Sequence, residues 1–246
     1  MNFLRMAPQI LTAAILVACI PPQDKSISSK QTSQKIGLNS SATRQAILIN
    51  KDWSYLEKAI DYEELSSIPS GAWQQIDLPH TWNALDATDN NPGYRRDASW
   101  YRKHISISET ANRLVLNFEG VNISSKVFVN GTEAGGHIGG YVGFEVDITD
   151  HIRSGEANEI LVWVDNSVNP NIIPSQKSDF FIFGGITRDV WLKSVPKVSL
   201  SALHISTPAV SHESATTHLS VEVSNHGDLK KELTALVQLT DPQGES

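Results

Sequence analysis

From Ile47 onward the chain consists of short runs in which apolar and polar residues alternate, separated by turn residues. An alternation with period two buries one face of a β-strand, whereas the 3.6-residue period of an amphipathic helix is scarce here. Because these runs follow one another without intervening helices, they predict an all-β domain, an antiparallel sandwich of jelly-roll type. The predicted strands are 100–107, 113–118, 126–133, 144–148, 160–164 and 188–193.

One hairpin can be located from its turn residues alone. Asn130-Gly131 lies inside the run 126–133, and both residue types tolerate the positive φ that a tight hairpin turn needs. We therefore expect two antiparallel strands to meet at this pair.

A second β unit begins near Leu200. The segments 202–208, 217–225 and 233–240 read as three strands, with turn residues at 212–214 and 225–228. Since an immunoglobulin-like sandwich needs about seven strands, we assign 47–198 to the first sandwich and 199–246 to the start of an incomplete immunoglobulin-like domain.

The N-terminus has the pattern of an export signal. Arg5 precedes an apolar stretch, 10–18, that is too short for a membrane span of about 20 residues but fits a signal peptide. It ends in Leu-Val-Ala-Cys at 16–19, which resembles the bacterial lipobox, in which the cysteine is acylated. The predicted signal peptide is therefore 1–19, with Cys19 as the lipidation site; the alternative is a cysteine buried in a short hydrophobic helix.

The segment 20–46 is rich in Ser, Gln and Lys and lacks aromatic residues. This composition is typical of a flexible tether. We expect an exported protein, held by lipid at a bacterial membrane, in the periplasm or at the cell surface.

Composition and charge limit the classes of binding partner that we expect for this chain. Hydrophobic residues make up 40% of the 246 residues, enough for a core, and the formal net charge is -7. An acidic chain without a Lys/Arg run has no basic surface that would attract nucleic acid or anionic lipid. We therefore expect no nucleic-acid partner, and we expect contact with a membrane only through the lipid anchor. A (β/α)₈ barrel needs roughly 200–250 residues, so these residues leave no room for one beside the sandwich.

Most familiar catalytic motifs are absent from the sequence. There is no Gly-x-Ser-x-Gly elbow, and Cys19 is the only cysteine, which excludes an internal disulfide and a thiolate metal cluster. The eight histidines show no metal-ligand spacing, so no metal and no cofactor is expected. The glycines at 135–140 precede no helix that could hold a phosphate, and we expect a turn between strands there.

Two polar, aromatic loops are the candidate binding features. One runs between 83 and 100 and contains Asp86, Asp89 and Tyr94; the other is 178–188. Long loops in compact domains usually serve a function or are disordered, and carboxylates, amides and rings suit the hydroxyls and the apolar face of a sugar. The alternative is that the rings belong to the core and the acids cap turns.

Seven short segments, taken in order, resemble a known domain. They are Leu-Pro-His-Thr-Trp-Asn at 78–83, Trp-Tyr-Arg-Lys at 100–103, Phe-Glu-Gly-Val at 118–121, Val-Phe-Val-Asn-Gly at 127–131, Gly-His-Ile-Gly-Gly-Tyr at 136–141, Phe-Glu-Val-Asp-Ile-Thr at 144–149, and the run 179–190 that ends in Gly-Ile-Thr-Arg-Asp-Val. This order is similar to that of the N-terminal sugar-binding jelly roll of glycoside hydrolase family 2, the family of β-galactosidases, β-glucuronidases and β-mannosidases.

The resemblance implies a site shared with a second domain. In the family the jelly roll packs beside a catalytic (β/α)₈ barrel of the same chain and lends residues to its active site. It implies that Asp179 and Asn91 contact hydroxyls of a β-galactoside or related glycan, although Asn90 or Asp89 could align in place of Asn91. Arg188 and Asp189 are expected to be structural, as an ion pair or a turn clamp.

The resemblance also implies what this chain lacks. The family uses two barrel glutamates about 5–5.5 Å apart, and neither is present, so we assign no catalytic residue and expect the chain alone to be inactive. The predicted function is the sugar-binding portion of a β-galactosidase-like enzyme. The alternatives are a free-standing carbohydrate-binding surface lipoprotein and a structural β-sandwich that mediates assembly.

Overall fold

The computed structural model describes residues 33–38, 44–86, 88–90, 93–108, 112–173, 181–227, 230, 232–234 and 236–238. All of them belong to the second of the two units of the chain, 31–246. The predicted signal peptide 1–19, with Cys19, lies outside these residues. Among the described helices, none is long and apolar enough to cross a membrane.

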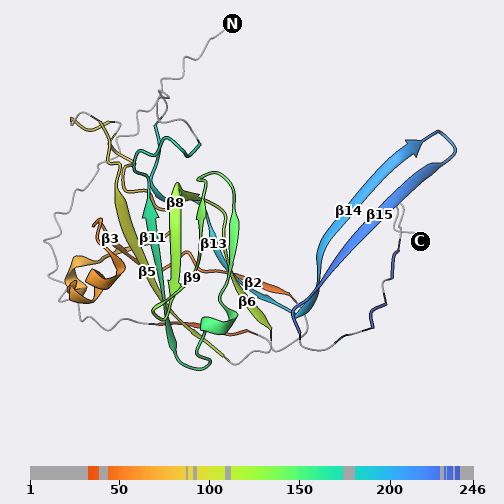
Figure 1. Ribbon diagram of the computed structural model, residues 1–246, viewed down its shortest axis with the longest axis horizontal. Coiled ribbons are helices and arrows are strands. Elements are labelled where there is room, and N and C mark those ends of the chain that lie inside the picture. The colour runs from red at the N-terminus through yellow and green to blue at the C-terminus, as the bar shows by residue number, and fades with distance from the viewer. Residues whose placement is uncertain are drawn as a thin grey trace, which may run out of the picture. The chain divides into compact units, whose positions relative to one another are not determined.

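The larger sheet of the sandwich has seven strands. Its path runs through β4 (Gln74–Ile76), β3 (Trp53–Leu56), β5 (Ala98–Ile107), β11 (Ala157–Asp165), β8 (Ser124–Val129) and β9 (Thr132–Ile138), which are antiparallel neighbours (Figure 1). The seventh strand, β1 (Gln34–Ile36), pairs parallel with the second half of β5. β5 thus pairs with three strands of this sheet, β1, β3 and β11.

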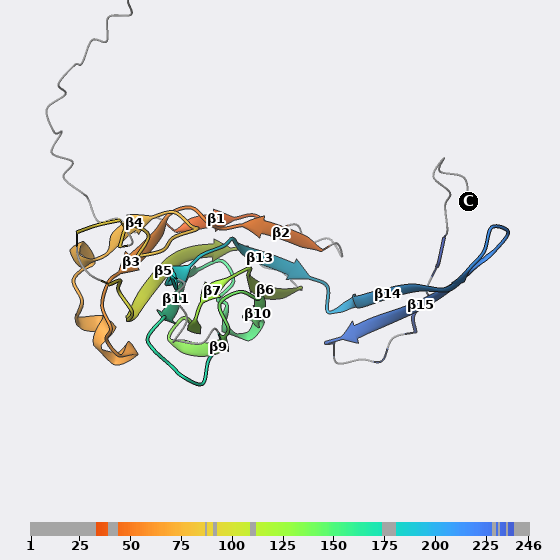
Figure 2. The ribbon, with the colours of Figure 1, turned by 90° about the horizontal axis from the view of Figure 1, so that it is seen from above.

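The smaller sheet is entirely antiparallel. Its order is β10 (Phe144–Asp147), β6 (Arg113–Phe118), β13 (Val190–Val195) and β2 (Gln45–Leu48) (Figure 2). Two two-residue strands, β7 (Val121–Asn122) and β12 (Gly185–Ile186), form a separate pair. The remaining short elements are the 3₁₀ helices η1 (Tyr62–Ser67), η2 (Ser70–Ala72) and η3 (Thr149–His151). The all-β sandwich predicted from the alternation is confirmed.

The core lies between the two sheets because alternate residues of each strand point inward. In β5, Tyr101, Ile105 and Ile107 belong to the central cluster and are 0% exposed. Lys103 shares this inward face and is 1% exposed; its Nζ donates a hydrogen bond to the carbonyl of Lys51 at 2.5 Å. Burial lowers the pKa of this amine.

A second apolar cluster covers the outer face of the larger sheet. Trp100 and Leu161 pack there with Trp73, and the segment around η1 and η2 lies over them. The Trp100 indole donates to the carbonyl of Ile60 at 2.9 Å. Both faces of this sheet are therefore buried over part of their area.

The glycine-rich segment differs from the sequence-based expectation. Asn130 and Gly131 have φ of 50° and 90°, and the predicted hairpin between β8 and β9 is confirmed. The turn expected at 135–140 is wrong for 135–138, which continue as part of β9. A Cβ on Gly136 would lie 2.4 Å from the carbonyl oxygen of Ser125, so glycine here allows two strands to approach closely.

The predicted tether, 20–46, contains residues of the sandwich. Ile36 and Leu38 are 3% and 7% exposed, and β1 contributes to the larger sheet. The physical reason is that two apolar side chains two positions apart point to the same side of an extended chain, so they can pack at the edge of the core even when the residues around them are polar. Because β1 begins at Gln34, the described chain joins the fold 13 residues before the predicted start at Ile47.

Beyond the sandwich, the chain forms one long hairpin. β14 (Val198–Val210) and β15 (Ala215–Asn225) are antiparallel, with irregular register after Leu200 and after Ser206. The third predicted strand, 233–240, is not a strand at its described residues 233, 234 and 236–238. The immunoglobulin-like assignment remains a prediction.

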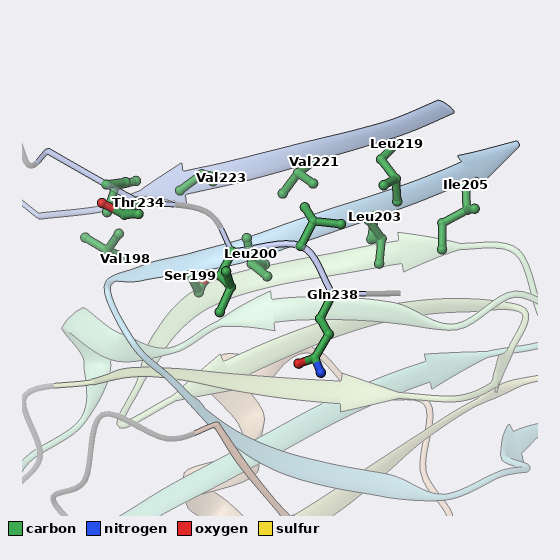
Figure 3. Close-up of a pocket in the computed structure, with 13 residues that line it drawn as sticks. Val198, Ser199, Leu200, Leu203, Ile205, Leu219, Val221, Val223, Thr234 and Gln238 are labelled. Atoms are coloured by element: carbon green, nitrogen blue, oxygen red, sulfur yellow. The ribbon is translucent and has the colours of Figure 1, made fainter. Parts of the chain in front are cut away.

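One face of this hairpin is apolar and exposed. Its side chains and those of Leu233, Leu236 and Val237 line a groove of about 620 Å³ (Figure 3). Leu203, Ile205 and Val221 are 56%, 62% and 38% exposed.

Candidate functional site

The two loops singled out in the sequence meet in the structure. One connects β4 to β5, and the other connects β11 to β12. Tyr94 of the first loop and Phe181 of the second are in ring contact, with centroids 4.1 Å apart.

Asn83 joins the loops at their base. It is 0% exposed, and its Nδ2 donates to the carbonyls of Ile182 at 3.0 Å and Arg95 at 3.2 Å. Its Oδ1 accepts from the amide of Gly184 at 3.0 Å and from the hydroxyl of Thr81 at 2.8 Å. One amide side chain thus fixes three backbone groups from two distant segments.

Asn166, just after β11, makes a parallel set of bonds. It is also 0% exposed, and its Nδ2 donates to the same carbonyls, those of Ile182 at 3.2 Å and Arg95 at 3.3 Å. Its Oδ1 accepts from the amide of Asp97 at 2.9 Å. We call Asn83 and Asn166 together the asparagine clamp.

Two glycines let the second loop lie against the first. A Cβ on Gly184 would lie 2.1 Å from Cζ2 of Trp82, and one on Gly185 would lie 2.5 Å from the carbonyl oxygen of His80. Gly185 also has φ of +130°, which side chains rarely adopt. The Gly-Gly pair is therefore required by close packing.

His80, in the β4–β5 loop, contacts a buried tyrosine of β5. Its Nδ1 lies 2.8 Å from the hydroxyl of Tyr101, and burial lowers the pKa of the imidazole. Burial also raises the pKa of the Tyr101 phenol well above its usual range. Burial thus favours the neutral form of both side chains.

The loop between β4 and β5, together with Glu57 just after β3, lines a cleft of about 330 Å³. We call this the loop cleft; it is lined by Glu57, Trp82, Asp86, Asp89, Gly93, Tyr94 and Arg95. Carboxylates and an aromatic wall are the groups that bind sugar hydroxyls and the apolar face of a pyranose ring.

Arg95 holds the cleft in shape. Its guanidinium donates to the Ser99 hydroxyl at 2.8 Å and to the Ala98 carbonyl at 2.6 Å, and lies 5.1 Å from the Trp82 ring. Its backbone amide donates to the carboxylate of Asp86 at 2.7 Å. The cleft is therefore preorganised by contacts within the chain.

Aromatic rings continue outward from the loop cleft. Phe181 contacts both Tyr94 and Phe183, and the second pair of ring centroids is 4.7 Å apart. Phe183 is 42% exposed, so this wall offers apolar surface to a ligand.

The predicted substrate contacts, Asn91 and Asp179, both lie outside the described residues. Their neighbours can be placed: Asp89 and Gly93, on either side of Asn91, line the loop cleft. Phe181, two residues after Asp179, contacts Tyr94. Of the alternatives to Asn91, Asp89 lines the cleft and Asn90 is exposed.

Asp189 has a structural position. Its carboxylate accepts from Nδ2 of Asn50 at 2.8 Å, and Oδ1 of the same Asn50 accepts from the amide of Val190 at 2.9 Å. Within the described part of the chain no ion pair links it to Arg188, whose stem packs on Gly120. Of the two expected roles, the structure shows the turn clamp.

Several residues of the site carry no signal in the sequence. Glu57 lines the cleft from just after β3, and Asn166 is the first residue of the β11–β12 connection, 12 residues before the segment 178–188 that the sequence singled out. In the described segments, no group of three or more His, Cys, Asp or Glu residues is placed to hold a metal ion.

Comparison with known proteins places this domain. Residues 41–196 match the family model described as "Glycosyl hydrolases family 2, sugar binding domain". A "Putative beta-glucuronidase" of Formosa agariphila is 55% identical over 198 residues, and a "Beta-glucuronidase" of Bacteroides fragilis is 37% identical over 171. They cover 80% and 69% of this chain.

Solved structures of β-glucuronidases are similar to this chain in fold as well as in sequence. A Bacteroides uniformis β-glucuronidase 2 covers 74% of the chain with a TM-score of 0.67 at 34% identity, and a Parabacteroides merdae β-glucuronidase covers 76% with 0.68 at 28%. The chain spans only about a quarter of these relatives, 24% of the Formosa protein and 22% of the Bacteroides uniformis chain.

Proposed function

The chain belongs to glycoside hydrolase family 2, whose sugar-binding domain it contains, and from this premise we propose that the loop cleft binds a sugar ring of a β-glycoside. The observation that carries the proposal is the loop cleft itself, where Trp82 and Tyr94 line the same space as three carboxylates and the asparagine clamp fixes the β4–β5 loop. Preorganised polar groups cost little ordering entropy on binding.

In this arrangement each kind of group has a role. The Tyr94 ring covers the apolar face of the sugar, and Asp89 accepts hydrogen bonds from hydroxyls. Asn91 and Asp179, one in each loop segment of the sequence, add further hydroxyl contacts in this proposal. Because few contacts come from this chain alone, we expect millimolar affinity, about -4 kcal/mol.

We propose that hydrolysis requires a further domain. The relatives named β-glucuronidase and β-galactosidase are about four times longer than the matched part. In a full-length enzyme, the loop cleft would form one wall of an active site whose two carboxylates lie on a barrel. The reaction is hydrolysis of an O-glycosidic bond, and the substrate is a β-galactoside or related glycan, including glucuronides.

Titration by nuclear magnetic resonance tests the sugar site. The ¹⁵N-labelled chain is titrated with methyl β-galactoside, and we expect amide shifts at Gly93, Tyr94 and Phe181. Asp179→Ala and Asn91→Ala should each weaken binding, because each removes a hydroxyl contact. Asp150→Ala, at an exposed acid in η3, is the matched control and should bind as the native chain does.

The outcomes separate the alternatives. Loss of binding in Asn90→Ala but not in Asn91→Ala would move the contact by one residue. An absence of any shift in the native chain at the highest soluble sugar concentration would refute the proposal and favour a structural sandwich. Turnover of a nitrophenyl galactoside by the chain alone would contradict the need for a barrel.

For localisation, we propose export and lipidation at Cys19. The support is the lipobox-like Leu-Val-Ala-Cys at 16–19 after a short apolar stretch. Metabolic labelling with palmitate should mark the native chain and not Cys19→Ser; equal label in both would refute the anchor.

The hairpin after the sandwich supports one more assignment. We propose that β14 and β15 are the first strands of an immunoglobulin-like domain, because their apolar face needs a second sheet to cover it. A longer chain carrying further strands should lower the exposure of Leu203 and Ile205 to a hydrophobic dye.

A further inference from the structure

The turn between β8 and β9 contains a pair of residues that can react with each other. In an Asn-Gly pair, the backbone nitrogen of the glycine can attack Cγ of the asparagine, because glycine has no side chain to obstruct the approach. Asn130 and Gly131 form such a pair at this turn, and the sequence contains no second Asn-Gly.

The reaction, deamidation, needs only water. The deprotonated Gly131 nitrogen forms a bond to Cγ of Asn130, the bond from Cγ to Nδ2 breaks, and Nδ2 takes up protons and leaves as ammonia. Water then opens the cyclic imide at one of its carbonyl carbons. The product at position 130 is aspartate or isoaspartate, and isoaspartate adds a carbon atom to the main chain.

In the folded chain the leaving nitrogen is held in place. Nδ2 of Asn130 donates to the carbonyl of His151 at 2.8 Å and to Oδ1 of Asn158 at 2.7 Å. Oδ1 of Asn130 accepts from the amide of Glu159 at 3.0 Å. These three bonds tie the turn to η3 and to β11, and they prevent the side-chain amide from rotating toward Gly131.

Asn158 cannot adapt to a carboxylate at position 130. It is 0% exposed, its Oδ1 also accepts from the amide of Arg153 at 2.7 Å, and its Nδ2 donates to the carbonyls of Arg153 and Glu156, both at 3.0 Å. An ionised aspartate has no proton to donate. Its oxygen would therefore face two oxygens, Oδ1 of Asn158 and the carbonyl of His151, in place of two hydrogen bonds.

We infer that Asn130 is a latent deamidation site: the folded chain protects it, local opening of the hairpin makes it reactive, and the product prevents the turn from closing as before. A modified residue 130 thus records that a molecule has opened. The inference does not depend on the sugar site, because Asn130 contacts the first residues of β11, whereas Asn166 of the asparagine clamp follows its last residue.

Peptide mapping by mass spectrometry tests the protection. The native chain is incubated at mildly alkaline pH, folded in one sample and unfolded in concentrated urea in the other, and conversion of residue 130 from amide to acid is followed over time. Two ordinary hydrogen bonds to the leaving nitrogen must break first, so we expect deamidation in the folded sample to be slower by roughly thirtyfold or more. Equal rates in the two samples would overturn the inference.

The variant Asn130→Asp tests the effect of the product. It should lower the midpoint of urea denaturation by about 1 M, because two hydrogen bonds are lost. Asn171→Asp, which makes the same change of charge at an exposed position, is the matched control and should keep the native midpoint. Failure of Asn130→Asp to fold while Asn171→Asp folds would be the extreme form of the expected result, whereas equal midpoints would show that the product does not disturb the turn and would overturn this part of the inference.

Discussion

Removing the side chain of Asn83 tests whether the asparagine clamp builds the loop cleft. Asn83→Ala deletes four hydrogen bonds, two donated and two accepted, at a position that is 0% exposed. The substitution leaves both loops and every cleft-lining residue otherwise unchanged.

The cost follows from which partners are left unpaired. The carbonyls of Ile182 and Arg95 each lose one hydrogen bond but keep the one to Asn166, so neither is left without a partner. The buried amide of Gly184 loses its acceptor, which costs about 1–3 kcal/mol. With about 1 kcal/mol for the remaining bonds, we expect the free energy of unfolding to fall by about 3 kcal/mol.

Urea denaturation measures this change. With a slope of about 1–3 kcal/mol per molar, the midpoint should fall by about 1–3 M. Asn117→Ala is the control, because that half-buried amide donates one long bond, 3.5 Å, to Phe144; it should cost less than about 1 kcal/mol. Hydrogen exchange at the Gly184 amide, which should become faster only in Asn83→Ala, reports the clamp directly.

A loss below about 1 kcal/mol, the size of one ordinary hydrogen bond, would contradict the reasoning. So would unchanged protection of the Gly184 amide. Either result would mean that Asn166 alone is enough to join the loops.

Three further predictions concern packing, pH and the hairpin. Gly184→Ala places a Cβ 2.1 Å from an indole carbon and should destabilise the fold by more than about 3 kcal/mol in urea denaturation, whereas Gly71→Ala, with nothing within 4 Å, should be neutral. Burial raises the pKa of Tyr55 from 10.0 to about 12. As the pH rises, the unfolded chain therefore loses this proton before the folded chain does, and the free energy of unfolding should fall by about 2 kcal/mol between these pH values. Urea denaturation should show this loss only above pH 10.0, and the loss should be smaller in Tyr55→Phe. Val221→Glu, on the apolar face of the hairpin, should reduce Nile red fluorescence, and Ser220→Glu, on the other face, should not; equal effects would show that the groove does not bind the dye.

The local signals in the sequence were sufficient for much of the sandwich. Alternation located 113–118 with the bounds that β6 has, and Asn130-Gly131 located a hairpin whose two residues have positive φ. These signals work because strand faces and tight turns depend on residues close together in the chain.

Contacts between distant residues could not be predicted in this way. β1 was placed in a tether because its composition is polar, and its place in the sheet depends on β5. The segment 57–73 lacks any alternation, yet Tyr62 stacks on Phe128 at 4.7 Å to cover the outer face of the sheet.

The candidate site shows the same division. Both loops were visible as polar, aromatic stretches, and the structure brings them together. That they meet through Asn83 and Asn166 was not predictable, because each is one asparagine among several without a distinctive spacing.

The sequence separation across the asparagine clamp has a consequence for the order of folding. Asn83 bonds to residues 99 and 101 positions later, and Asn50 to one 140 positions later. Loops of this length close slowly, and during synthesis the residues that line the cleft, all between 57 and 95, emerge long before residues 166–184, which fix their loop in place. The loop cleft should therefore be among the last features to form, so that a sugar bound there recognises only completed molecules and stabilises them against unfolding.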